Sequence, residues 1–337
     1  MTITTSHFDH IHSAHCESGV MSALTHHYGF PISEAMAFGL SSALAFAFLP
    51  FIKISGMPLV SYRMLPKAIL LGLQKPLRFS MRIETFRRPE DGMARLDELL
   101  DAGKIMGMQV NIFFLPCMPP DFRFWFNGHN LLVYGRDKAN GDYLLFEPIF
   151  GQHARCSPDD LVKARFARGV FAPKGMLYYP TSAPQEPRWE RAIPAALKKT
   201  ARIMRAPLPF FGTRGIERCA RAFERLPAAT DPQATKLYIG HLIRMQEEIG
   251  TGGGGFRFMY AAFLEEAATR IARPVLAELA AQLVEIGDLW REFALVTAGM
   301  IRDRDPLDPG LLATLLRAQA AREKTFFISL DKAARLS

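Results

Sequence analysis

Apolar and polar residues alternate with two different periods along the chain, and the period changes near residue 180. In the first half, short segments alternate apolar with polar side chains, as half-buried strands do, between segments of helical period. Beyond about residue 190 only helical patterns occur, as in residues 261–272, 275–286 and 311–320. Strands are expected at residues 77–86, 109–115, 130–134, 143–146 and 176–179, and helices at 16–28, 33–52, 89–102 and after Ser157.

A proline-rich polar segment separates the two patterns. Residues 181–189 read TSAPQEPRW, a composition typical of a linker. The chain is therefore expected to fold as α+β, with a mixed domain over residues 1–180, a linker over 181–189 and a helical domain over 190–337.

One uncharged stretch raises the question of a membrane. Residues 35–52 carry no charge over 18 positions, which is near the lower limit for a spanning helix. Gly39, Ser41 and Ser42 reduce its apolar character, and Pro50 would end a helix before it crossed. We therefore expect a small-residue helix buried in the core and no membrane span.

Composition excludes several classes of protein. The chain has 337 residues, 49% of them apolar, and a net charge of +8, so a disordered or fibrous chain is not expected. Four widely spaced cysteines without a CxxC pair argue against a disulfide framework or a structural zinc site. The first 16 residues lack the basic and apolar regions of a secretory signal, which favours the cytoplasm. Basic residues are interleaved with acids and no nucleic-acid motif occurs, so nucleic acid is not expected as a partner.

Cys16 stands at the start of the first predicted helix. A thiol there faces unpaired amides and the positive end of the helix dipole, both of which favour the thiolate. Those amides can also hold an oxyanion when the sulfur attacks a carbonyl. The alternative is that Cys16 is a small buried apolar residue.

A histidine and an acid are expected to meet at one end of the sheet. His129 leads into a predicted strand, Asn140-Gly141 indicates a hairpin, and Glu147 ends the next strand. A carboxylate beside the imidazole would fix its tautomer and stabilise imidazolium, while the other ring nitrogen serves the sulfur. The order of cysteine, histidine and acid is that of papain-like sites and favours catalysis over a structural histidine.

The chain resembles a known family in these same residues. HCES at 15–18, YGFPISEA at 28–35, GHN at 128–130, YGRD at 134–137 and FEP at 146–148 resemble the N-terminal domain of the butirosin-biosynthesis protein H family, over roughly residues 13–180. IGTGGGGFR at 249–257 and FLEEA at 263–267 resemble the helical domain often fused to it.

The resemblance implies a papain-like fold of the bacteriocin-processing-peptidase type. It also implies transfer of an acyl group from the phosphopantetheine of an acyl carrier protein to an amine, as in the family's named member, with no further cofactor. Cys16 takes the place of the nucleophile, His129 that of the base, and Glu147 that of an acid that is more often Asp, so Asp137 remains a competitor for orienting His129. His10 stands where related peptidases carry a glutamine that donates to the oxyanion, which weighs against ordinary peptidase activity.

Further residues are expected to contact substrates. His10, His15 and Asn127 flank the cysteine and histidine, whereas Arg257, Tyr260 and Glu265 follow the glycine run at helical spacing. Arg257 and Glu265 suit anionic and ammonium groups, and a structural salt link is the alternative. The glycine run itself, residues 250–255, fits GxGxxG but follows a helix, so it indicates a turn and not a nucleotide site. His7, His10, His12 and His15 do not have the spacing of a metal site, and no metal is expected.

Basic residues on both sides of the linker favour an acidic carrier protein as partner, although ordinary solvated faces explain them equally well. They are Arg155, Lys163, Arg165, Arg168, Lys174, Arg188, Arg191, Lys198, Lys199, Arg202 and Arg205. The function expected is a cysteine acyltransferase of specialised-metabolite biosynthesis that acts on a small amine or hydroxyl acceptor. A thioesterase or peptidase using the same residues, or a scaffold protein without catalysis, are the alternatives. The oligomeric state is left open.

Overall fold

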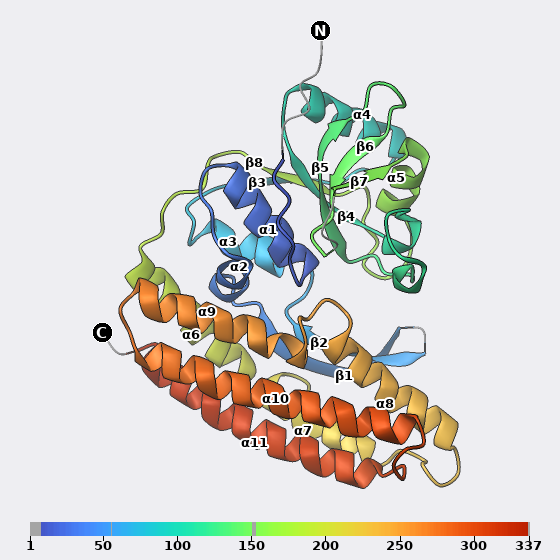
Figure 1. Ribbon diagram of the computed structural model, residues 1–337, viewed down its shortest axis with the longest axis vertical. Coiled ribbons are helices and arrows are strands. Elements are labelled where there is room, and N and C mark those ends of the chain that lie inside the picture. The colour runs from blue at the N-terminus through green and yellow to red at the C-terminus, as the bar shows by residue number, and fades with distance from the viewer. Residues whose placement is uncertain (1–7, 55, 150–152, 336–337) are drawn as a thin grey trace. The chain divides into compact units, whose positions relative to one another are not determined.

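The computed structural model describes residues 8–54, 56–149 and 153–335, which group into two compact units (Figure 1). The first, called here the sheet unit, comprises residues 1–37 and 69–187, and the second, the helical unit, comprises residues 38–68 and 188–337. The first unit combines a six-stranded sheet with helices and the second is mainly helical, so the predicted α+β class is confirmed.

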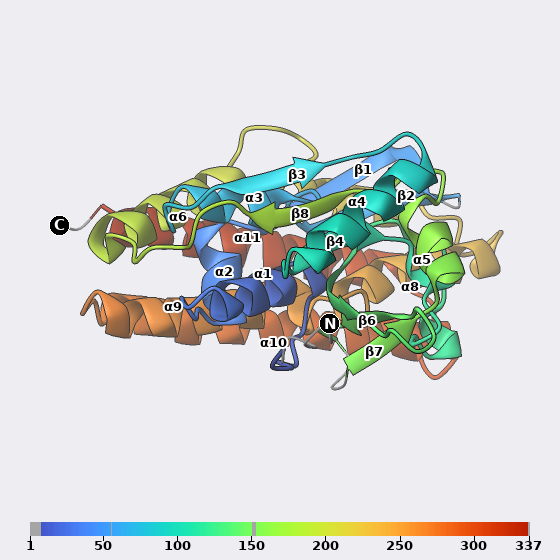
Figure 2. The ribbon, with the colours of Figure 1, turned by 90° about the horizontal axis from the view of Figure 1, so that it is seen from above.

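The sheet unit is built on six antiparallel strands in the order β3-β8-β4-β5-β6-β7. The last strand of the unit along the chain, β8, lies inside the sheet between β3 and β4, and Figure 2 shows β3 and β8 side by side. The strands are β3 (Met81–Glu84), β4 (Met106–Val110), β5 (His129–Arg136), β6 (Tyr143–Phe146), β7 (His153–Cys156) and β8 (Leu177–Pro180).

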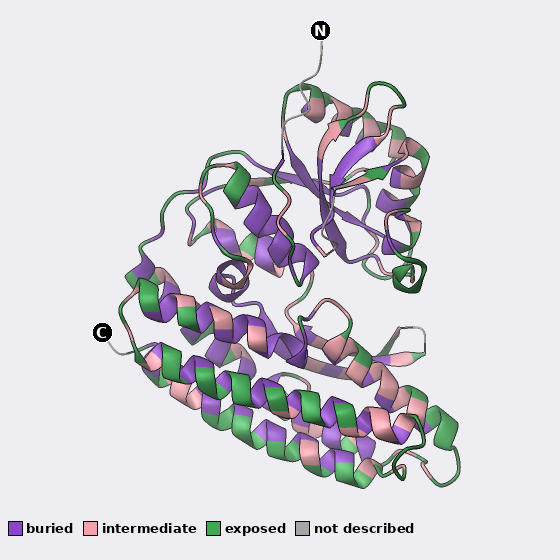
Figure 3. Ribbon diagram, viewed as in Figure 1, coloured by how far each residue is buried: buried purple, intermediate pink, exposed green. Residues whose placement is uncertain are grey.

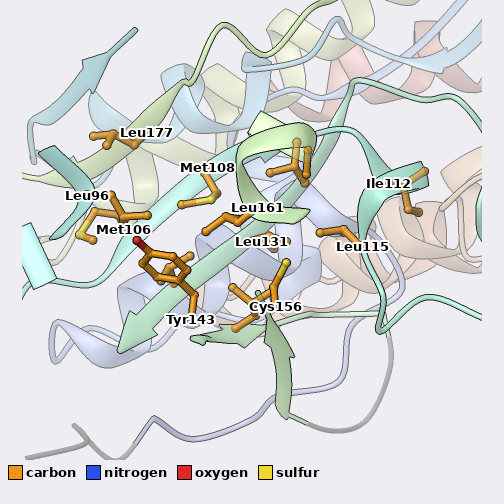
Figure 4. Packing of buried hydrophobic residues seen from close by; sticks show 14 of the residues in the cluster. Leu96, Met106, Met108, Ile112, Leu115, Leu131, Tyr143, Cys156, Leu161 and Leu177 are labelled. Carbon is orange, nitrogen blue, oxygen red and sulfur yellow. The ribbon is translucent and has the colours of Figure 1, made fainter. Parts of the chain in front are cut away.

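Two amphipathic helices cover one face of this sheet. α4 (Pro89–Asp101) begins with a proline and two acids, and α5 (Pro158–Arg165) is capped by Ser157, whose hydroxyl accepts from the Asp160 amide at 3.2 Å. Leu96 of α4 and Leu161 of α5 pack with Met108, Leu131 and their neighbours in one buried cluster (Figure 4). The helix α1 (Cys16–His27) packs against β5 from the other side.

The helical unit consists of helices around a short hairpin. Long α10 and α11 each bury one side and expose the other, as Figure 3 shows, because apolar residues recur three and four positions apart. The elements are β1 (Leu44–Ile54), β2 (Met57–Arg63), α6 (Trp189–Met204), α7 (Gly212–Phe223), α8 (Pro232–Glu247), η3 (Gly254–Phe256), α9 (Arg257–Arg270), α10 (Val275–Ile301) and α11 (Pro309–Ala333). Two further helices, α2 (Glu34–Leu40) and α3 (Ala68–Gln74), cross from one unit to the other along the chain.

The helix predicted over residues 35–52 is wrong beyond its first turns. Ser33 caps α2 as expected, with its hydroxyl accepting from the Met36 amide at 2.9 Å, but α2 ends at Leu40 and β1 begins at Leu44. Ser42 between them has a left-handed φ of 58°, which breaks the helix. The residues that follow pair with β2. An uncharged run of small and aromatic residues suits a buried strand as well as a helix, so periodicity alone misassigned it.

Other predicted elements differ at their ends. The strand expected at residues 77–86 is shortened to β3, and that expected at 109–115 is β4 followed by a 3-10 turn, η1 (Ile112–Phe114). A second such turn, η2 (Pro120–Phe122), follows it, and β7 had not been predicted. The hairpin of β5 and β6 is confirmed.

The predicted linker lies along the sheet unit for most of its length. The amides of Thr181 and Gln185 donate to the carbonyls of Ser80 and Leu77, and α6 begins at Trp189. The two units are not contiguous in sequence, because residues 38–68 group with the C-terminal helices, whereas the sequence had assigned them to the first domain. Within the residues described, no helix combines the length and apolar character needed to cross a membrane.

A buried ion pair ties three helices of the helical unit together. Arg257 of α9 and Glu323 of α11 are both fully buried, and two nitrogens of the guanidinium donate to the two carboxylate oxygens at 2.9 and 3.0 Å. The indole of Trp290 on α10 donates to the same carboxylate at 2.7 Å. Because each charge is hydrogen-bonded on several sides, the cost of removing it from water is offset.

We expect Glu323→Ala to lower the free energy of unfolding by about 3–5 kcal/mol, since it leaves a buried guanidinium without its carboxylate. Urea unfolding followed by circular dichroism measures the change. The control is Glu248→Ala, which breaks the exposed Arg244–Glu248 pair and should cost less than about 1 kcal/mol. Equal effects of the two substitutions would contradict this account of the pair.

Candidate active site

Cys16 is the first residue of α1, and the helix is held firmly at this end. The carboxylate of the next residue, Glu17, is buried and accepts from the amides of Ile69 and Leu70 at 3.0 and 3.2 Å, at the start of α3. Ten residues of α1 are buried, so the first turn is fixed against its neighbours. The sulfur therefore lies at a rigid helix N-terminus, where the backbone amides favour negative charge.

His129 and Glu147 meet at one end of the β5–β6 hairpin. His129 is the first residue of β5, Leu132 pairs with Phe146 across the hairpin, and Glu147 follows β6 directly. The imidazole Nε2 lies 2.9 Å from the Glu147 carboxylate, and both side chains are at least 98% buried. The second carboxylate oxygen accepts from the Ile149 amide at 3.0 Å, which orients the group. The extra methylene of Glu relative to Asp is thus accommodated.

The imidazoles of His129 and His15 are the two groups that lower the pKa of Cys16. Burial by itself raises the pKa of the thiol, but the charge of His15 and the hydrogen bonds from both imidazoles outweigh it, so the pKa of Cys16 lies well below its ordinary value. Burial lowers the pKa of His129, and its bonds to Cys16 and Glu147 outweigh that effect and raise the pKa to about 10. The pair therefore favours thiolate and imidazolium at neutral pH.

The other three cysteines have the opposite environment. Burial raises the pKa of Cys117 to about 11 and that of Cys156 to about 12, and it also raises the pKa of Cys219. A thiolate is the reactive form of cysteine. Cys16 is thus set apart chemically from the other three thiols of the chain.

His15 is connected to a carboxylate that the sequence had not indicated. Its Nδ1 lies 2.9 Å from the Ser18 hydroxyl, which donates to Glu34 at 2.9 Å. Glu34 also accepts from the amides of Ala14 and His15, each at 2.8 Å. The spacing of His15 and Ser18 fits the start of a helix, but Glu34 lies on α2, and only the tertiary fold brings it to this place.

The remaining residues predicted near the thiol have structural bonds. His10 is half-buried, and its Nε2 lies 3.0 Å from the backbone oxygen of Glu147. Because a carbonyl oxygen only accepts, the imidazole donates this hydrogen bond. The Asn127 amide is 97% buried, accepts from Asn111 at 2.7 Å and donates to the carbonyls of Arg168 and Val170 at 3.1 and 2.8 Å. These bonds hold the loop after α5 beside the strand that carries His129.

The predicted contacts on α9 lie in the helical unit and have different environments. Arg257 and Tyr260 are fully buried, whereas Glu265 is exposed, so the structure does not bring the three side chains to one face. The guanidinium of Arg257 is bound by Glu323, as in the structural salt link considered from the sequence. Of the four histidines at the start of the chain, His7 lies outside the described residues, and the described residues contain no cluster of three or more groups suited to a metal.

Both parts of the chain match known families. Residues 15–148 match the family described as Butirosin biosynthesis protein H, N-terminal, and residues 159–330, more than half of the chain, match a domain of unknown function, DUF4872. The first match contains Cys16, His129 and Glu147. None of the curated proteins compared with the chain matches it. The chain therefore belongs to the butirosin-biosynthesis protein H family.

Substitution of Glu147 by Gln should lower the pKa of His129 by about one to three pH units, because the imidazolium loses the carboxylate at its Nε2. An NMR titration of the His129 ring measures the change. Asp137→Asn is the control: the Asp137 carboxylate pairs with Arg155 at the surface, and its loss should leave the ring unaffected. A fall in the control but not in Glu147→Gln would make Asp137 the orienting acid.

Proposed function

We propose that this member of the butirosin-biosynthesis protein H family is a cysteine acyltransferase with a papain-like site in its sheet unit. It takes an acyl group from the phosphopantetheine thioester of an acyl carrier protein and passes it to an amine or hydroxyl of a small molecule in specialised metabolism. The observation that carries the proposal is the buried ion pair of His129 with Glu147 at 2.9 Å, together with the coupling of His129 to the thiol of Cys16 at the start of α1.

The first step suits a thiolate. The sulfur of Cys16 attacks the thioester carbonyl, a new carbon–sulfur bond forms, and the bond to the pantetheine sulfur breaks. One thioester replaces another, so the exchange is close to balanced in energy. The departing sulfur takes a proton from the His129 imidazolium and leaves as a thiol.

The second step needs a base where the first needed an acid. His129 is now neutral and accepts the proton of the attacking amine, while the bond between the acyl carbon and Cys16 breaks and the thiolate is restored. Water attacking in place of the amine would release a free acid. The near-complete burial of Cys16, His129 and Glu147 supports transfer over hydrolysis, because it limits the water that reaches the acyl group.

A basic groove of the sheet unit supports an acidic carrier protein as donor. Arg87, Arg168 and Lys174 are among the residues lining this open groove of about 680 Å³. Such a surface attracts the acidic face of a carrier and the phosphate of its prosthetic arm. Arg165, counted with these cations from the sequence, is instead fully buried and donates to the carbonyls of Gly92 and Gly175.

Incubation with an acyl-carrier thioester, followed by intact-mass measurement, should give an acyl adduct on the wild-type chain and none on Cys16→Ala. Cys117→Ala is the control and should keep the adduct, since burial raises the pKa of Cys117. With an amine acceptor the product should be the amide, and Cys16→Ala should lower its formation by about 10⁴-fold. Release of free acid at a rate that is indifferent to amines would favour a thioesterase, and unchanged pathway activity in Cys16→Ala would favour a scaffold protein.

The rate of adduct formation should follow a bell-shaped pH profile. It should rise with pH as the thiol ionises, at a pH well below the ordinary pKa of a cysteine, since the pKa of Cys16 is lowered. It should fall again as His129 loses the proton that the leaving sulfur needs, toward pH 10. Single-turnover rates measured from pH 5 to pH 11 test both limbs, and an ascending limb near pH 9 would contradict the thiolate–imidazolium pair.

A further inference from the structure

The basic groove of the sheet unit carries positive charge that no carboxylate balances. Three exposed cations, Arg87, Arg168 and Lys174, line it, and the described residues of its lining include no acid. None of the three is ion-paired in the part of the chain that the structure describes. Thr85 adds a hydroxyl to the same lining. An anion that enters the groove therefore meets donors that are not already bound to an acid.

A buried guanidinium beside the groove adds to this charge. Arg165 precedes the groove residue Phe166, is fully buried and donates at 2.7 Å to the carbonyl of Gly175, the residue after Lys174. Within the described residues no carboxylate pairs with it, and its Nε has no hydrogen-bond partner. Burial lowers its pKa to about 10, which reflects the cost of holding a charge away from water. An anion bound close by would offset that cost.

Two buried amides hold the loop that carries Arg168. Gln109 of β4 donates to the carbonyl of Phe171 at 2.9 Å, and Asn127 donates to the carbonyls of Arg168 and Val170 at 3.1 and 2.8 Å. Both amide side chains are at most 4% exposed. Because these bonds go to backbone carbonyls, they do not depend on the side chain at position 168. A ligand can thus bind without first ordering the loop.

The groove lies at the same end of the sheet as His129. Val110, the last residue of β4, pairs with His129 of β5. Two residues earlier in β4, Met108 pairs with Leu177 at the start of β8, and Leu177 pairs with Glu84 at the end of β3. The groove residues directly follow β3 and precede β8. Three strand spacings of about 4.8 Å each, roughly 14 Å in all, separate β3 from β5.

We propose that the basic groove binds the phosphate ester of the donor's prosthetic arm, with Arg87, Arg168 and Lys174 as the groups that hold it. The inference deepens the proposed function and rests on it for the identity of the donor. Guanidinium and ammonium groups form charge-assisted hydrogen bonds with phosphate oxygens. Phe86 and Phe166 also line the groove, and they offer apolar surface to the dimethyl carbon that follows the phosphate in pantetheine.

The length of the arm fits this placement. From phosphorus to sulfur the arm has about 13 bonds, and three bonds of extended chain span roughly 3.5 Å, so it reaches about 15 Å. The distance across the sheet from β3 to β5 is of the same size. A phosphate held in the groove therefore leaves the thioester within reach of the end of the sheet where His129 lies. Binding remote from the reacting carbonyl would in this way position it.

The test compares phosphopantetheine with pantetheine, which lacks the phosphate, in ligand-observed NMR titrations of the full chain. Phosphopantetheine should bind at least about tenfold more tightly, and its affinity should fall as salt is added. Arg168→Gln and Lys174→Asn should each weaken its binding by about tenfold and leave that of pantetheine unchanged. Asn serves at position 174 because Lys174 has a left-handed φ of 54°, which Asn tolerates better than most residues.

Lys75→Gln is the matched control, because it removes an exposed cation of the same unit that does not line the groove, and it should bind like the wild type. Equal binding of phosphopantetheine and pantetheine, no binding of either, or wild-type binding by both groove variants would overturn the proposal. The ligands carry no acyl group, and Cys16→Ala should bind them unchanged. A failure of the groove is therefore distinguished from a failure of Cys16 as the nucleophile.

Two further ligands separate the sources of the phosphate. A holo-carrier protein presents the arm on a protein surface, whereas coenzyme A presents it on a nucleotide. Tighter binding of the carrier identifies a carrier-borne arm, and equal or tighter binding of coenzyme A identifies the free coenzyme. Either result supports the phosphate site, provided that Arg168→Gln and Lys174→Asn weaken the binding.

Discussion

The structure depends on one electrostatic constraint: a negative sulfur at a buried position needs a positive partner. A thiolate 95% removed from solvent would revert to the thiol unless nearby groups stabilised its charge, since burial alone raises a thiol pKa. Helix α1 supplies its amides, and two imidazoles supply positive charge. Glu147 holds the imidazole of His129 directly, whereas that of His15 contacts the Ser18 hydroxyl. The anchoring of Glu17 on α3 and the register of β5 with β6 serve to keep these groups within hydrogen-bonding distance.

The family matches and the folded units divide the chain differently. The first match ends at residue 148 and the second begins at residue 159, yet β7, α5 and β8 all lie after the first match and complete the sheet unit. β8 pairs with both β3 and β4, so the sheet that positions His129 is interrupted without it. Residues 38–68, which lie within the first match, group with the helices. The two family segments therefore do not correspond to two independently folding domains.

The sequence predicted those parts of the site that follow from secondary structure and from short distances along the chain. A cysteine at a helix start, and a histidine and an acid on neighbouring strands of a hairpin, follow from secondary structure, and the structure brings Cys16, His129 and Glu147 together. The hydrogen bond from Ser18 to Glu34 could not be predicted, because it depends on how α2 packs beside the start of α1. The prediction that Arg257, Tyr260 and Glu265 share one face was wrong for a geometric reason. A helix rotates by about 100° per residue, so Glu265, five residues after Tyr260, points roughly 140° away from it. Residues 44–54 were misassigned because an uncharged apolar run fits a strand and a helix alike.

The identity of the nucleophile narrows the chemistry that the proposed site can serve. A thiolate is a weaker base than an alkoxide or an amide anion, so it displaces another thiolate easily and an amine only with assistance. Thioesters are therefore the donors that suit Cys16, whereas peptide bonds would require a strong oxyanion donor. The histidine at position 10, where related peptidases carry glutamine, is hydrogen-bonded to the backbone carbonyl of Glu147. In the proposed reaction a stabilised thiolate thus favours donors that are already activated. In the proposed reaction the acceptor must bring a neutral amine or a hydroxyl whose proton the imidazole of His129 can remove, so the base and the choice of a thioester donor are parts of the same chemical requirement.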